Sequence, residues 1–164
     1  MQLSETRKML IPFSEIVLKT MDVNQVAAHV GGVAESILIG FYGWKKNGKI
    51  GNEKGYDAVD QQGNKIEIKG MSNESKTNYV AYSHEAKGGK YDLLTILHFN
   101  EKRVATIPIY EIENFISKNK LPGRKTKSLR LNFNDPLLTK LGKPRKKSLF
   151  QALFLKYEDK KFTF

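Results

Sequence analysis

Apolar residues recur at helical spacing near the start of the chain. The residues that set the spacing are Val26, Val30, Val33, Ile37 and Phe41. Intervals of three or four residues place side chains on one face of a helix, and Asp22 or Asn24 could cap its first turn. The pattern predicts a helix from about Asp22 to Gly40, and from Val23 to Trp44 the only charged side chain, histidine aside, is Glu35.

The middle of the chain instead alternates or runs apolar over short stretches, as strands do. The predicted strands are Tyr56–Asp60, Lys65–Met71, Asn78–His84, Leu93–Phe99 and Val104–Ile107. Gly63 suits the left-handed position of a three-residue loop between the first two strands, which are therefore expected to form a hairpin. The apolar run at 93–99 is typical of a central strand.

Two apolar segments follow the strands. Pro108 opens a predicted helix with Ile109, Ile112, Phe115 and Ile116 facing inward. Ser148–Tyr157 is apolar enough to return to the core. Because no repeat or linker divides residues 1–164, we expect a single domain of the α/β (α+β) class, with a mixed central sheet flanked by helices.

The net positive charge of the chain indicates a negatively charged binding partner. The chain has 28 Lys+Arg against 17 Asp+Glu, a net charge of +11, and this surplus favours a polyanion, with nucleic acid ahead of an anionic membrane surface. The surplus is concentrated at about 120–147, where Asp135 is the only acid. Its basic residues are Lys120, Arg124, Lys125, Lys127, Arg130, Lys140, Lys143, Arg145, Lys146 and Lys147.

Several classes of site are excluded or disfavoured. The absence of cysteine excludes disulfides, thiolate metal sites and cysteine nucleophiles. No apolar run resembles a membrane span or a signal-peptide core, so a cytoplasmic protein is expected. His29, His84 and His98 are too scattered for a metal triad. No P-loop, Rossmann glycine run or Ser–His–Asp elbow is present.

The predicted hairpin gathers charged residues. If its loop has three residues, Asp60 pairs with Asn64, and Asp57 then lies directly opposite Glu67. Lys69 is two residues beyond Glu67 and shares its face, whereas the intervening isoleucines point to the core.

Such a cluster has a chemical use. Two close carboxylates repel each other unless a cation lies between them, and Mg²⁺ prefers oxygen ligands of this kind. A lysine beside the metal can orient the attacking water or stabilise charge that grows on a phosphate. These are the parts that metal-assisted phosphodiester hydrolysis requires. The alternative interpretation is a solvated hairpin face with a structural ion pair.

Asp57 followed by Glu67-Ile68-Lys69 resembles the PD-(D/E)xK nuclease superfamily, to which many type II restriction enzymes belong. Tyr56–Gly70 is similar to a PvuII-like active-site hairpin, with Tyr56 where the superfamily pattern usually has proline. The chain is also similar to a family of uncharacterised restriction-endonuclease-like proteins, over about Gly31 to Glu113. The matching stretches are Gly31–Glu35, Gly55–Asp60 and Lys90–Phe99.

The resemblance implies a restriction-endonuclease-like core with one or two Mg²⁺ per active site. Asp57, Glu67 and the main-chain carbonyl of Ile68 would be metal ligands, and Lys69 the catalytic lysine. Glu35 would be a further catalytic carboxylate contributed by the helix, with Glu53 as the competing candidate.

Other residues are expected to bind DNA. The polar loop after the hairpin contributes Ser72, Asn73 and Lys76, whose side-chain types suit phosphates and base edges. The basic segment would hold backbone phosphates without reading sequence. The remaining expected contacts are Lys54, His84, Arg124, Lys125, Lys127, Arg130, Lys143, Arg145, Lys146 and Lys147.

The leading hypothesis is therefore a Mg²⁺-dependent DNA endonuclease acting on double-stranded DNA. A type II restriction enzyme is the favoured role, and a homodimer is expected by analogy, because cutting two strands usually needs two sites. A structure-specific or repair nuclease, similar to Holliday-junction resolvases, is the nearest alternative. A non-catalytic basic nucleic-acid-binding protein is the alternative from another class, and an RNA substrate ranks low.

Overall fold

A mixed five-stranded sheet organises the chain, in the order β1-β2-β3-β5-β6. The computed structural model describes residues 23–48, 55–72, 79–82, 90–119, 127–131, 133 and 149–162. The sheet's strands are β1 (Lys45–Lys46), β2 (Ala58–Val59), β3 (Lys65–Met71), β5 (Leu93–His98) and β6 (Arg103–Pro108). A second sheet pairs β4 (Tyr79–Tyr82) with β7 (Lys127–Arg130). The helices are α2 (Val23–Tyr42), α3 (Ile109–Lys118) and α4 (Leu149–Lys156).

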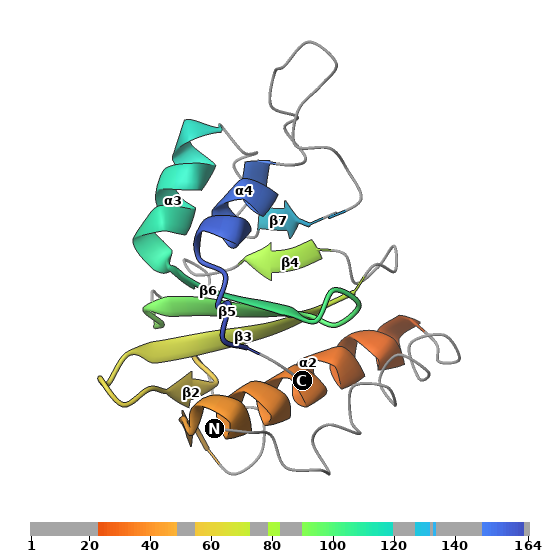
Figure 1. Ribbon diagram of the computed structural model, residues 1–164, viewed down its shortest axis with the longest axis vertical. Helices are drawn as coiled ribbons and strands as arrows, with labels where there is room; N and C mark the ends of the chain where they lie inside the picture. The colour runs from red at the N-terminus through yellow and green to blue at the C-terminus, as the bar shows by residue number, and fades with distance from the viewer. Residues whose placement is uncertain are drawn as a thin grey trace.

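The five-stranded sheet has a different layer on each face. Helix α2 lies along one face, while α3, α4 and the β4–β7 sheet lie on the other (Figure 1). Ile66 and Ile68 of β3 are buried in the core shared with α2, and Met71 is buried in the core on the opposite side. The predicted mixed sheet flanked by helices is confirmed. No helix in the described part of the chain is long and apolar enough to cross a bilayer.

The expected hairpin forms from β2 and β3. Its strands are antiparallel, with Ala58 paired to Ile66, and the Asp60 N–H donates to the carbonyl of Asn64 at 3.1 Å. Gly63 has a φ of 86°, so the predicted left-handed loop position is confirmed. The carboxylate of Asp60 accepts from two backbone N–H groups of the loop and stabilises it locally.

Strand β5 is central, as its apolar run predicted. It pairs in parallel with β3 and antiparallel with β6. A strand was predicted at 78–84 and expected in the central sheet; β4 lies within that segment but pairs with β7 in the second sheet. Neither β1 nor β7 was predicted, since β1 consists of two lysines and β7 lies in the basic segment.

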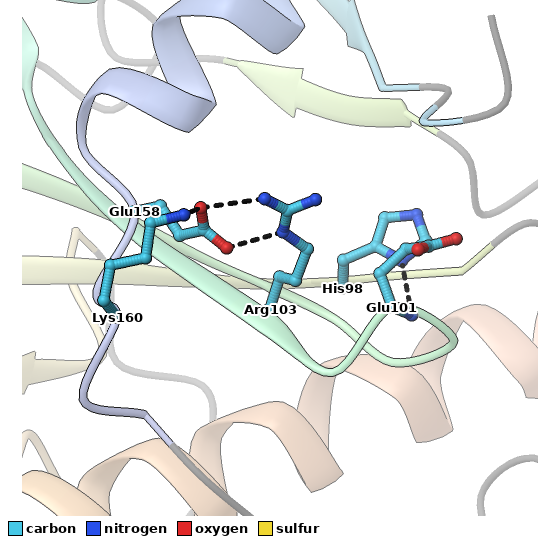
Figure 2. A network of polar contacts seen from close by, with 5 residues as sticks. All are labelled: His98, Glu101, Arg103, Glu158 and Lys160. Carbon is cyan, nitrogen blue, oxygen red and sulfur yellow. Dashed lines mark hydrogen bonds and ion pairs between the residues drawn. The ribbon is translucent and has the colours of Figure 1, made fainter.

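Residues 158–162, which we call the strap, follow α4, and Glu158 and Asp159 lie along the outer edge of β6. Asp159 donates its N–H to the Val104 carbonyl at 2.9 Å, and Glu158 accepts two hydrogen bonds from the Arg103 guanidinium at 2.5 and 2.9 Å (Figure 2). The Tyr42 hydroxyl donates to the Asp159 carboxylate at 2.6 Å, which ties the strap to α2. The strap therefore covers a sheet edge and joins the two layers.

His98 lies at the turn between β5 and β6. Its side chain is fully buried, and its Nδ1 accepts the Glu101 N–H at 3.4 Å (Figure 2). Its ring packs edge-on against Phe133. Within the described residues, its Nε2 is buried and has no hydrogen-bond partner. Burial lowers the pKa of His98 to about 4, which keeps the ring neutral in the core.

Candidate active site

Asp57 marks the point at which β2 leaves β3. Its N–H donates to the Ile66 carbonyl at 2.8 Å as a strand residue would, but its carbonyl accepts from Asn47 at 2.9 Å. The hydrogen-bond acceptor for the Ile68 N–H is therefore the Asp57 side chain and not its carbonyl: Oδ2 accepts this N–H at 2.6 Å. The carboxylate is thus fixed against the edge of β3 where strand pairing ends.

The Ile68 carbonyl faces the same edge. In a β-strand, the N–H and C=O of one residue point to the same side. Because the Ile68 N–H points to Asp57, its carbonyl oxygen also lies on the Asp57 side of β3. A main-chain oxygen and a carboxylate are therefore next to each other at this edge.

Glu67 and Lys69 come from the face of β3 opposite to α2. Lys69 Nζ contacts Glu67 Oε1 directly, and the Glu67 side chain is only 1% exposed. A carboxylate this deeply buried needs a compensating charge, which the ammonium group supplies. Lys69 keeps a third of its side chain exposed, so the pair opens to solvent on the lysine side.

Glu35 reaches the cluster from α2. Its pKa is raised, first by partial burial and then by the negative charge of Asp57, while the ammonium groups of Lys46 and Lys69 act in the opposite direction. Glu35 therefore lies within electrostatic range of the hairpin residues. The structure brings together Glu35, Asp57, Glu67 and Lys69; the competing Glu53 lies outside the described residues.

The donor set suits a hard cation. Asp57, Glu67 and the Ile68 carbonyl offer oxygen atoms, the ligand type that Mg²⁺ takes from proteins. Across the described ranges, no group of three or more histidine or carboxylate side chains is arranged to hold a metal. A Mg²⁺ ion here would therefore rely on two carboxylates, a main-chain oxygen, and water or substrate oxygens, a mode that Mg²⁺ commonly uses.

The expected DNA contacts are placed unevenly. Ser72 is fully buried, which is at odds with its predicted contact, because strand β3 carries its backbone into the core before the polar loop begins. Lys127 and Arg130 belong to β7. The other predicted contacts lie outside the described residues: Lys54, Asn73, Lys76, His84, Arg124, Lys125, Lys143, Arg145, Lys146 and Lys147.

Sequence reasoning missed Lys46. Its Nζ lies 4.0 Å from Glu35 Oε2, and its strand is hydrogen-bonded to the chain around Asp57. The available signal was a lysine doublet, Lys45 and Lys46, shortly before the hairpin.

Comparisons with known proteins give a structural likeness without a match to a known family or curated protein. No protein-family model matches the chain, and no curated protein matches it. Among solved structures, a bacterial homing endonuclease, I-Ssp6803I, matches with 19% sequence identity and a TM-score of 0.47. The match covers 84% of this chain and 95% of that chain.

Proposed function

We propose that this chain is a Mg²⁺-dependent DNA endonuclease of the PD-(D/E)xK type. The observation that carries the proposal is the placement of Asp57, Glu67 and Lys69 where the pairing of β2 with β3 ends, with Glu35 of α2 within electrostatic range. Two acids and a lysine where a strand loses its partner, with a third acid within electrostatic range, are more than a solvated hairpin face requires, because one of the acids is almost fully buried.

Each residue has a role that follows from its position. Asp57 and Glu67 would hold the metal together with the Ile68 carbonyl, and Mg²⁺ bound there would supply Lewis-acid polarisation of a phosphate. Lys69, exposed on one side, would orient the attacking water or donate to the phosphate oxygen that gains charge. Glu35 would accept a hydrogen bond from a water molecule at the rim of the site.

The substrate class follows from charge. A net charge of +11 supports a polyanionic substrate, and the basic segment at 120–147 would contact phosphates of duplex DNA. Type II restriction by a homodimer remains the favoured role, since each protomer contributes one such site and duplex cleavage needs two.

The test uses purified wild-type protein, the Lys69→Ala variant and a matched Lys118→Ala control. Lys118 is an exposed lysine at the end of α3, so the control removes the same charge outside the site. Long duplex DNA is incubated with and without Mg²⁺. Mg²⁺-dependent fragments from wild type and Lys118→Ala, and their absence with Lys69→Ala, are the expected result.

Two outcomes would redirect the proposal. If all proteins retard intact DNA in a gel whatever the metal, the protein is a basic nucleic-acid-binding protein without this chemistry. If duplex DNA stays intact but branched DNA is cut, the same site belongs to a structure-specific nuclease.

A further inference from the structure

Lys46 is held beside the site by its main chain. Strand β1 pairs with β2 so that Lys46 lies opposite Ala58, the residue after Asp57. Asn47, the next residue, donates its backbone N–H to the Asp57 carbonyl and its side-chain amide to the Tyr56 carbonyl, both at 2.9 Å. The backbone of β1 is therefore fixed to the backbone of the candidate metal ligand.

The face of β1 decides where Lys46 points. Residues directly opposed in antiparallel strands lie on the same face, and Ala58 is buried in the core shared with α2. Lys46 thus shares the face from which Glu35 approaches, whereas the preceding Lys45 lies on the other face.

The Lys46–Glu35 pair is loose. Its charged atoms are 4.0 Å apart, and 44% of the Lys46 side chain is exposed. An exposed pair at this separation contributes little to stability, so its ammonium group can exchange one partner for another at small cost. A phosphate oxygen of DNA can form the same kind of charge-assisted hydrogen bond with such a group.

The site contains more carboxyl groups than ammonium groups. Glu35, Asp57 and Glu67 contribute three carboxyl groups, and Lys69 is already engaged by Glu67. An incoming phosphodiester adds a further negative charge, and a second cation at the rim reduces that repulsion.

We propose that Lys46 is a phosphate-binding residue of this site, which leaves Glu35 and contacts a backbone phosphate of the DNA when the substrate enters. The inference rests on the proposed nuclease function. It assigns Lys46 to substrate binding, not to the attack on phosphorus.

The experiment compares Lys46→Ala, Lys46→Arg and Lys45→Ala. Steady-state cleavage of a duplex is measured in Mg²⁺, and binding is measured by fluorescence anisotropy in Ca²⁺ over a range of salt concentrations. Lys46→Ala is expected to raise KM about tenfold with little change in kcat, as one charge-assisted phosphate contact is lost. In a plot of log association constant against log salt concentration, the slope for Lys46→Ala should be less negative by about 0.9, the value for one phosphate contact on B-DNA.

The comparison variants separate binding from structure. Lys46→Arg should keep both values close to wild type, and Lys45→Ala should change neither, because it removes an equal charge from the other face of the same strand. A Lys46→Ala variant with unchanged KM and salt dependence would overturn the inference while leaving a cleaving wild type intact. A wild type that binds DNA but does not cut would defeat the proposed function alone, since the salt dependence still reports on Lys46. A wild type that binds no DNA would overturn both.

Discussion

The carboxylate of Asp57 accepts the backbone N–H of Ile68 at 2.6 Å, so a side chain closes the edge of β3 where strand pairing stops. One residue thus has both a structural task and a place in the candidate site. Asn can accept the same hydrogen bond through its amide oxygen, but it carries no charge. This difference allows the two tasks to be separated by mutation.

We predict that Asp57→Asn abolishes cleavage, because the charge of the carboxylate is lost. The free energy of unfolding should stay within about 1 kcal/mol of wild type, because the amide oxygen still accepts the Ile68 N–H. Asp57→Ala should abolish cleavage and also destabilise the fold by about 1–3 kcal/mol, since the Ile68 N–H loses its partner. Urea unfolding and a DNA cleavage assay measure the two effects. Equal stability of the two variants would contradict a structural role for the carboxylate.

Lys69 and Glu67 form a pair that can be tested as a double-mutant cycle. Lys69→Met should destabilise the protein by about 2 kcal/mol, because it leaves a buried carboxylate without its cation. Adding Glu67→Gln should recover most of that loss, since the uncompensated charge is removed, while cleavage remains absent in both. Chemical denaturation supplies the coupling energy. Strictly additive losses would show that the two side chains do not depend on each other.

Gly70 lies where α2 packs closely on β3. A Cβ atom there would lie 2.5 Å from both the carbonyl oxygen and Cγ1 of Val30, so Gly70→Ala must push the helix away. We expect a loss of about 1–3 kcal/mol and weaker cleavage, because α2 carries Glu35. Gly63→Ala is the control: it has open space in the hairpin loop and should cost about 1 kcal/mol for its positive φ, with activity retained.

Buried His98 predicts a pH dependence of stability. Its folded pKa of about 4 is below the ordinary value of 6.5, so the unfolded state binds more protons between these pH values. Stability should therefore be complete above pH 6.5 and fall by up to about 3 kcal/mol as the pH drops towards 4. Urea unfolding from pH 4.5 to 7.5 measures this slope.

The His98→Asn variant is the control for that slope. Asn can still accept the Glu101 N–H, but it does not titrate, so its slope between pH 4.5 and 6.5 should be markedly smaller. Glu158, whose pKa is lowered to about 2 by Arg103, loses its contribution only below pH 4.5 and does not interfere. An unchanged slope in His98→Asn would assign the effect to other groups.

The hairpin could be predicted because its signals are local. Gly63 fixes the loop, the loop fixes the register, and the register places Asp57 opposite Glu67. The burial of Glu67 could not be predicted in the same way. Its alternation with Ile66 and Ile68 indicated an outer face, but the layer formed by α3, α4 and the β4–β7 sheet lies on that face (Figure 1).

Non-local pairings explain the other differences. Tyr79 of β4 pairs with Arg130 of β7 across about fifty residues, and neither strand shows which partner it takes. Strand β1 has no apolar alternation, since both its residues are exposed lysines, and only its hydrogen bonds to the chain near Asp57 define it. Lys46 was missed for the same reason: its relation to Glu35 exists only in three dimensions.

The strap also sets an order of events during folding. Its hydrogen bond from Tyr42 to Asp159 joins residues 117 positions apart, and the Arg103–Glu158 pair joins residues 55 apart. Contacts at such separations close large loops and form slowly compared with local hairpins. On a ribosome, the outer edge of β6 stays open until residues 158–162 have emerged. During that interval the unpaired backbone groups at this edge can pair with a strand of a neighbouring chain. This pairing is blocked once Glu158 binds Arg103 and the strap covers the edge.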